Sequence, residues 1–171
     1  MRLPVLHTER LHLEPLRLEH APLLHTITGD PEVFWWGADR TVAETRAGIE
    51  RLLAGDLPDG LGTWLLFDRS SDEAVGDVVL KPVPRPNGEI EAGWHLVRAH
   101  WGKGYATEAA RRIVAHAFCT LGLEEVVSDI AVTNGRSQAV ARRLGMAPRP
   151  PQIKRLGIVH DVWRLSRPAP T

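Results

Sequence analysis

The sequence is poor in three features that each define a class of protein: cysteine, net charge and long apolar runs. Its single cysteine, Cys119, cannot close a disulfide within the chain, and the N-terminal segment lacks the apolar stretch and cleavage site of a secretory signal. We therefore expect a cytoplasmic location. We also expect Cys119 to be a buried small residue rather than a nucleophile.

The charges of the chain balance, because 21 Lys and Arg residues match 21 Asp and Glu residues. Without net charge there is no field to hold a polyanion or an anionic membrane, so we expect no nucleic-acid partner. No apolar run reaches the roughly 18 residues that a membrane-spanning helix needs, so we expect no membrane span. The eight histidines show no metal-ligand spacing, and we expect no metal.

Length and composition indicate one globular unit. The chain has 171 residues, of which 43% are hydrophobic and 25% charged, which suffices for one core but not for two. We expect a single domain over residues 1–171, with a disordered, Pro-containing tail at about 166–171.

The first half of the chain alternates between strand and helix patterns. Leu11, Leu13 and Leu16 indicate a first strand, which Pro15 ends or confines to a sheet edge. Thr41 and Glu44 form a capping box, in which each side chain satisfies the other's free backbone N–H, and they open a helix. The predicted elements are a strand near 11–16, helices over 19–28 and 42–54, and antiparallel strands over 63–68 and 74–81.

The second half contains the clearest element, a long amphipathic helix. Its apolar residues from Ala106 to Leu121 recur every three or four positions, while Glu108, Arg111, Arg112 and His116 are expected to face away. The other predicted elements are strands over 89–96, 126–132 and 158–165 and a helix over 137–144 that Asn134 opens. This order predicts a mixed α+β or α/β sheet with helices packed on it, in which the unit over 89–132 is a right-handed parallel crossover.

A glycine loop joins the strand over 89–96 to the long helix. Gly102 and Gly104 let the backbone approach an anion closely, and the helix start adds free N–H groups and a positive dipole end. Lys103 adds a charge, so the loop suits a pyrophosphate. The alternative is that the glycines only make a tight turn.

Two other phosphate-binding motifs fit the loop poorly. A P-loop needs Ser or Thr after its lysine and a glycine five residues before it, but Gly104 and Arg98 stand there. A dinucleotide fingerprint needs a third small residue where Thr107 stands and an acid at the end of the next strand. Glu124 and Glu125 instead precede that strand.

Four motifs in the same order resemble those of the GNAT superfamily of N-acetyltransferases. They are most similar to the branch that acetylates the N-termini of ribosomal proteins, and the resemblance covers nearly the whole chain. The motifs are Thr8-Glu9-Arg10-Leu11-His12-Leu13; Gly93-Trp94-His95-Leu96 with Trp101-Gly102-Lys103-Gly104-Tyr105-Ala106-Thr107-Glu108-Ala109; Asn134-Gly135-Arg136-Ser137 with Leu144-Gly145-Met146; and His160-Asp161.

The resemblance implies a fold, a cosubstrate and its binding residues. The implied fold is a mostly antiparallel sheet with one splayed parallel pair, and the implied cosubstrate is acetyl-coenzyme A. Its pantetheine is expected along the strand edge at His95 and Leu96, and Asn134 is expected on the cofactor side. The implied pyrophosphate site consists of Gly102, Lys103, Gly104, Tyr105, Ala106 and Thr107.

Acetyl transfer to an amine needs a proton acceptor, an oxyanion donor and a proton source for the thiolate. Glu91 is a candidate base because strand alternation puts it on one face with Glu89, Gly93 and His95. Asp129 matches a position that holds a base in some relatives. A solvated strand carboxylate and a structural histidine are the alternatives. The backbone N–H near Leu96 is the expected oxyanion donor.

The resemblance is incomplete at the proton donor and leaves the acceptor open. Many family members have a tyrosine where this chain has Ala141, so Ser137 is the remaining candidate, unless it only bonds within its helix turn. Trp35 and Trp36 match the region that lines the acceptor site in relatives, although core packing is the alternative.

These observations predict an enzyme that acetylates a primary amine, either a protein N-terminus or a small molecule. The alternatives are a coenzyme A binding module that has lost catalysis and a structural domain that binds a nucleotide. The sequence leaves the oligomeric state open, although a homodimer is common in the branch that the motifs resemble.

Overall fold

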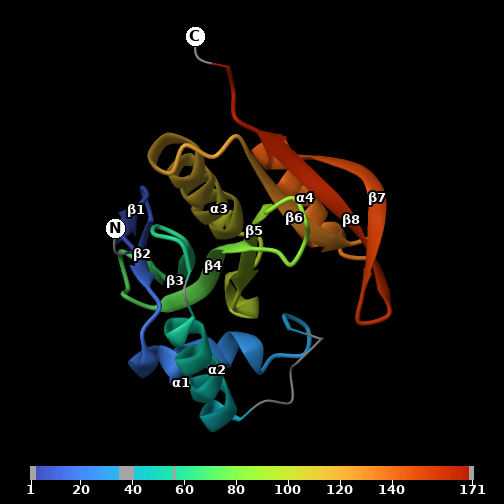
Figure 1. The fold of residues 1–171 in the computed structure, drawn as a ribbon. Coiled ribbons are helices and arrows are strands. Elements are labelled where there is room, and N and C mark those ends of the chain that lie inside the picture. The colour runs from blue at the N-terminus through green and yellow to red at the C-terminus, as the bar shows by residue number, and fades with distance from the viewer. Residues whose placement is uncertain (1–2, 35–40, 56, 170–171) are drawn as a thin grey trace.

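A computed structural model describes residues 3–34, 41–55 and 57–169 of the chain. They form one sheet of eight strands in the order β1-β2-β3-β4-β5-β6-β8-β7, with helices on both sides (Figure 1). Every neighbouring pair is antiparallel except β5 and β6, which run parallel. The predicted mixed, mostly antiparallel sheet is therefore confirmed.

The observed elements follow the predicted order. The strands are β1 (Leu6–His7), β2 (Leu11–Pro15), β3 (Gly62–Asp68), β4 (Ala74–Pro82), β5 (Ile90–Leu96), β6 (Glu125–Ala131), β7 (Ala147–Arg155) and β8 (Ile158–Ser166). The helices are α1 (Ala21–Thr28), α2 (Val42–Ala54), α3 (Tyr105–Ala115) and α4 (Gly135–Leu144), with short 3-10 turns at Leu18–His20 and Arg98–His100. The capping box predicted α2 correctly, since the Thr41 hydroxyl accepts a hydrogen bond from the Glu44 N–H and the Glu44 carboxylate accepts one from the Thr41 N–H.

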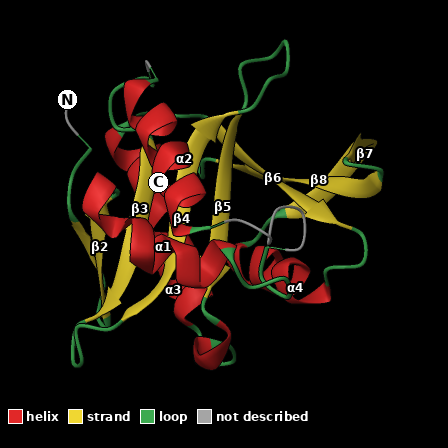
Figure 2. Cartoon of the chain, turned by 90° about the horizontal axis from the view of Figure 1, so that it is seen from below, coloured by secondary structure: helices red, strands yellow, loops and turns green. Residues whose placement is uncertain are grey.

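Strand alternation separates two cores on opposite faces of the sheet. Trp64 and Leu66 of β3 are buried in the larger core with α3, whereas their neighbour Leu65 is buried in a smaller core with α1 and α2. Figure 2 shows these helices around the sheet and α4 beside β6 and β8. The same alternation in β5 puts Ala92 and Leu96 on the α3 face. Glu91 and its alternate neighbours therefore lie on the face of α1 and α2.

Two sequence interpretations for the end of the long helix are wrong. His116 does not face away, since it is buried in a π-helical turn (His116–Thr120), where its Nε2 lies 3.0 Å from the Gly60 carbonyl oxygen. Cys119, in the same turn, is exposed rather than buried. The sequence also gave no sign of the outer strand β7, which pairs with β8 despite three prolines.

The parallel pair at the centre of the sheet is short. β4 pairs with β5 along the whole length of β5, but the ladder between β5 and β6 holds one register pair, Glu91 with Val127. Beyond that pair the two strands leave the sheet open between them. In the described part of the chain no helix is long and apolar enough to cross a membrane.

Candidate active site

The glycine loop has the backbone conformation that its glycines predict. Gly102 and Gly104 have φ of 78° and 84°, a region that residues with a Cβ rarely adopt, and Gly104 is the residue before the first turn of α3. A Cβ on Gly102 would meet nothing within 4 Å, so conformation rather than crowding requires glycine there. The N–H groups at the start of α3 therefore lie at an open surface, where the helix dipole favours an anion.

Arg10, from the turn between β1 and β2, holds this loop in place. Its Nη1 donates a 2.9 Å hydrogen bond to the Lys103 carbonyl, its Nε donates one of 2.7 Å to Glu108, and its guanidinium lies 4.7 Å from the centre of the Tyr105 ring. Burial raises the pKa of Glu108, but hydrogen bonds from Thr8 and Arg10 outweigh it and hold that pKa below its ordinary value. The sequence motifs contained these residues without showing their role.

A cavity of about 1350 Å³ extends from the glycine loop through the opening between β5 and β6. On the α3 face it is lined by Gly102, Gly104 and Trp94, and on the face of α1 and α2 by Glu91 and His95. Ser128 of β6 donates a 2.5 Å hydrogen bond to the Ala92 carbonyl and so bridges the two strands. The cavity therefore connects both faces of the sheet.

The predicted residues at the start of α4 also line this cavity. Asn134 caps α4 by accepting a 3.1 Å hydrogen bond from the Ser137 N–H, and both side chains border the cavity. Ala141 is fully buried in the core, so it offers no group to the cavity. Arg136 lies 4.2 Å from the ring centre of Trp101, whose Nε1 donates a 2.9 Å hydrogen bond to the Leu96 carbonyl.

His95 and Asp77 form a pair on the opposite face of the sheet. They are register partners in β5 and β4, and His95 Nδ1 lies 3.1 Å from Asp77 Oδ2. Burial lowers the pKa of His95, but the Asp77 carboxylate outweighs it, so the pKa is raised above its ordinary value. Phe34 packs edge-on against the imidazole, with ring centres 5.3 Å apart.

The two predicted carboxylates, Glu91 of β5 and Asp129 of β6, lie near each other because both are close to the one register pair that joins these strands. Arg155 of β7 connects them, since its Nη1 lies 3.6 Å from Glu91 Oε1 and 3.1 Å from Asp129 Oδ2. Asp129 also accepts a short hydrogen bond from Arg85. Glu91 Oε2 is buried and accepts no hydrogen bond from any described residue, although Lys81 Nζ lies 3.4 Å away.

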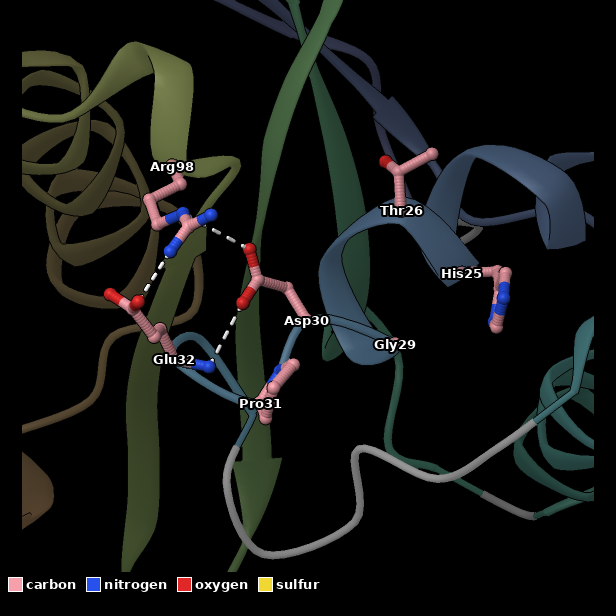
Figure 3. Close-up of a pocket in the computed structure, with 7 residues that line it drawn as sticks. All are labelled: His25, Thr26, Gly29, Asp30, Pro31, Glu32 and Arg98. Atoms are coloured by element: carbon pink, nitrogen blue, oxygen red, sulfur yellow. Dashed lines mark hydrogen bonds and ion pairs between the residues drawn. The ribbon is translucent and has the colours of Figure 1, made fainter.

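A second cluster fixes the chain between α1 and the predicted aromatic segment. Arg98 contacts Asp30 and Glu32, and Asp30 accepts a 2.9 Å hydrogen bond from the Glu32 N–H, around a hollow of about 460 Å³ (Figure 3). These contacts hold the backbone that leads to Phe34. The predicted acceptor-site residues Trp35 and Trp36 follow it and lie outside the described residues.

Comparison with known proteins shows the class of this chain. The family model described as "Acetyltransferase (GNAT) domain" matches residues 10–147. The chain is 34% identical to FsC-acetyl coenzyme A-N(2)-transacetylase of Aspergillus fumigatus, over 98% of this chain and 82% of that protein. The protein is therefore an acyltransferase.

Solved structures agree with this result. An acetyltransferase from Agrobacterium tumefaciens has 30% identity and a TM-score of 0.82, over 98% of this chain and 96% of that one. A ribosomal L7/L12 alpha-N-protein acetyltransferase in complex with coenzyme A shares the fold, with 20% identity and a TM-score of 0.77 over 96% and 97% of the two chains. The chain belongs to the GNAT acetyltransferase family, as its four motifs predicted.

Proposed function

We propose that this enzyme transfers the acetyl group of acetyl-coenzyme A to a primary amine, by direct attack of the amine while both substrates are bound. The observation that carries the proposal is the cavity, which joins the glycine loop on one face of the sheet to a carboxylate and a histidine on the other. Two substrates entering from opposite faces would meet between β5 and β6. The name of the fungal relative, FsC-acetyl coenzyme A-N(2)-transacetylase, supports the same chemistry.

In this proposal the glycine loop and the open strand edge hold acetyl-coenzyme A. The N–H groups between Gly102 and Thr107 bind its pyrophosphate, with Lys103 as an added positive charge. The pantetheine pairs with the β5 backbone at His95 and Leu96, which β6 leaves uncovered. Asn134, which borders the cavity from the α4 side, contacts the cofactor.

Glu91 is the better candidate for the base that takes a proton from the amine, through water. It lines the cavity, and its buried Oε2 has no hydrogen-bond donor among the described residues, so it retains the capacity to accept one. Asp129 is a weaker candidate because its carboxylate already accepts hydrogen bonds from Arg85 and Arg155.

Ser137 is the proposed proton donor to the departing thiolate. It borders the cavity at the first turn of α4, whereas Ala141 is buried in the core and has no hydroxyl. The Leu96 backbone N–H is the proposed oxyanion donor.

The first test is thermal unfolding with millimolar acetyl-coenzyme A, coenzyme A, NAD or ATP. A ligand at about 100 times its Kd adds roughly 2.7 kcal/mol of stability. Stabilisation by the two coenzyme A species, followed by thiol release with an amine panel, is the expected result. Stabilisation without thiol release would indicate a binding module that lacks catalysis, and a shift only with NAD or ATP would contradict the proposal.

A further inference from the structure

On the cavity wall that faces α1 and α2, the positively charged side chains are exposed and the carboxylates are buried. The Glu91 side chain is 10% exposed, while that of its partner Lys81 is 40% exposed. The Asp129 side chain is 2% exposed, while that of Arg155 is 48% exposed. A molecule that enters from this face therefore meets cations before it meets carboxylates.

Lys81 and Arg155 lie on either side of one carboxylate. They contact the two oxygens of the same Glu91 carboxylate, at 3.4 Å from Oε2 and 3.6 Å from Oε1. Both contacts of Arg155 to the carboxylates use Nη1, so the other N–H groups of the guanidinium are not engaged with them. One small anionic group could reach both side chains.

Other charged groups nearby are paired within the protein. Asp77 holds the pKa of His95 above its ordinary value, and its carboxylate offsets the charge of the protonated imidazole. Among the described residues, the exposed carboxylate of Glu32 borders the cavity on this side, and Arg98 contacts it. Its negative charge is thus already matched.

We propose, building on the amine acetylation proposed above, that the acceptor carries a carboxylate close to its reacting amine, and that Lys81 and Arg155 bind this carboxylate. A planar carboxylate fits the fork of an arginine, and a lysine adds a compact positive charge. A diamine would instead bring a second cation to a wall that presents cations. The substrate class is therefore an amino acid or a similar amino carboxylate, rather than a polyamine.

The test compares acceptors of equal chain length that carry a primary amine at one end. The other end is a carboxylate, a hydroxyl or a second amine, in sets from two to five carbons. We expect kcat/KM for the best amino carboxylate to exceed that for its amino alcohol by about 10- to 100-fold, the range of one or two charge-assisted hydrogen bonds. Added salt should reduce this ratio.

Three variants connect the preference to the named side chains. Arg155→Gln and Lys81→Gln should each reduce the ratio of carboxylate to alcohol, whereas Lys154→Gln, an exposed residue of the same hairpin, should leave it unchanged. An equal or greater kcat/KM for the alcohol or diamine, or a ratio that neither variant alters, would overturn the proposal.

Binding measurements separate this inference from the acetyl transfer that it rests on. Calorimetry with protein saturated by coenzyme A, which lacks the acetyl group, measures the affinity of the same acceptors without turnover. Tighter binding of the carboxylate, lost in Arg155→Gln, would support the subsite even if no acceptor were acetylated. Turnover of the alcohols without any carboxylate preference would retain the proposed function and reject the subsite.

Discussion

Arg10 and Glu108 stand 98 positions apart in the sequence and form a two-point ion pair, with Arg10 Nε and Nη2 at 2.7 Å and 2.6 Å from Glu108 Oε2. The pair ties the turn before β2 to the first turns of α3. Because Arg10 also bonds to the Lys103 carbonyl, the same side chain fixes the glycine loop. The opening motif of the sequence is thus part of the structure that holds the glycine loop.

Arg10→Ala should lower both stability and coenzyme A affinity. The lost charge-assisted bonds are worth about 1–2 kcal/mol, at the lower end of their range because Arg10 is half exposed. Since the pKa of Glu108 is lowered in the folded state, this contribution is present above about pH 4.3 and is lost as the pH falls through the lowered pKa. Urea unfolding against pH measures it, with Arg46→Ala, from the exposed pair with Glu50, as the control. An equal effect in both variants would contradict the assigned role.

Gly104→Ala should weaken coenzyme A binding through the shape of the loop. Gly104 has φ of 84°, which costs a residue with a Cβ about 1–2 kcal/mol. Gly122 has φ of 69° outside the cavity, so Gly122→Ala is a control with similar strain. Both variants should lose stability, but calorimetry should show weaker coenzyme A binding only for Gly104→Ala. Equal coenzyme A affinities for the two variants would indicate that the glycine loop is only a turn.

Glu91→Gln should impair catalysis, whereas Asp129→Asn should impair stability. Glu91→Gln should lower kcat by about 10²- to 10⁴-fold with little loss of stability, as expected for a lost base. Asp129→Asn removes the shared partner of Arg85 and Arg155, so we expect a loss of stability on the order of 3 kcal/mol. Stopped assays of thiol release and thermal unfolding measure the two effects. If Asp129→Asn lowered kcat without loss of stability and Glu91→Gln retained full activity, the roles would be reversed.

Asp77→Asn should lower the pKa of His95, because burial then acts without the opposing carboxylate. In the wild type the raised pKa means that protonated His95 stabilises the fold below about pH 6.5, and this contribution is lost as the pH rises through the folded-state pKa. The stability difference between wild type and variant should therefore shrink at alkaline pH. NMR titration of the imidazole measures the pKa, and the exposed Asp72→Asn is the control. An unchanged titration would exclude Asp77 as the cause.

The parts of the fold that depend on local chemistry were predictable from the sequence. Thr41 and Glu44 fixed the start of α2, and Asn134 and Gly104 stand at the helix starts where the patterns predicted them. The parts that depend on long-range contacts were not. The helical spacing predicted a solvent-facing His116, but its side chain is buried beside the carbonyl oxygen of Gly60, which is distant in the sequence.

The candidate site shows the same division. The glycine loop was visible because a positive φ demands a particular residue, whereas the ion pairs around Glu91 depend on a hairpin that brings Arg155 across from a distant part of the chain. The prolines in this hairpin kept its outer strand from being predicted, because proline is incompatible with a central strand although an edge strand tolerates it. The order of charged residues in the sequence therefore could not show which carboxylates form ion pairs with arginine or lysine.

The prolines of β7 also affect how two copies of this chain can associate. β7 is the last strand of the sheet, and Pro148, Pro150 and Pro151 have no N–H to offer a further strand. Such an edge resists extension by a neighbouring molecule. If two copies form a homodimer, their two sheets would not join into one continuous sheet along β7. The outer edge of the hairpin that carries Arg155 would then form no hydrogen bonds to a strand of the second copy.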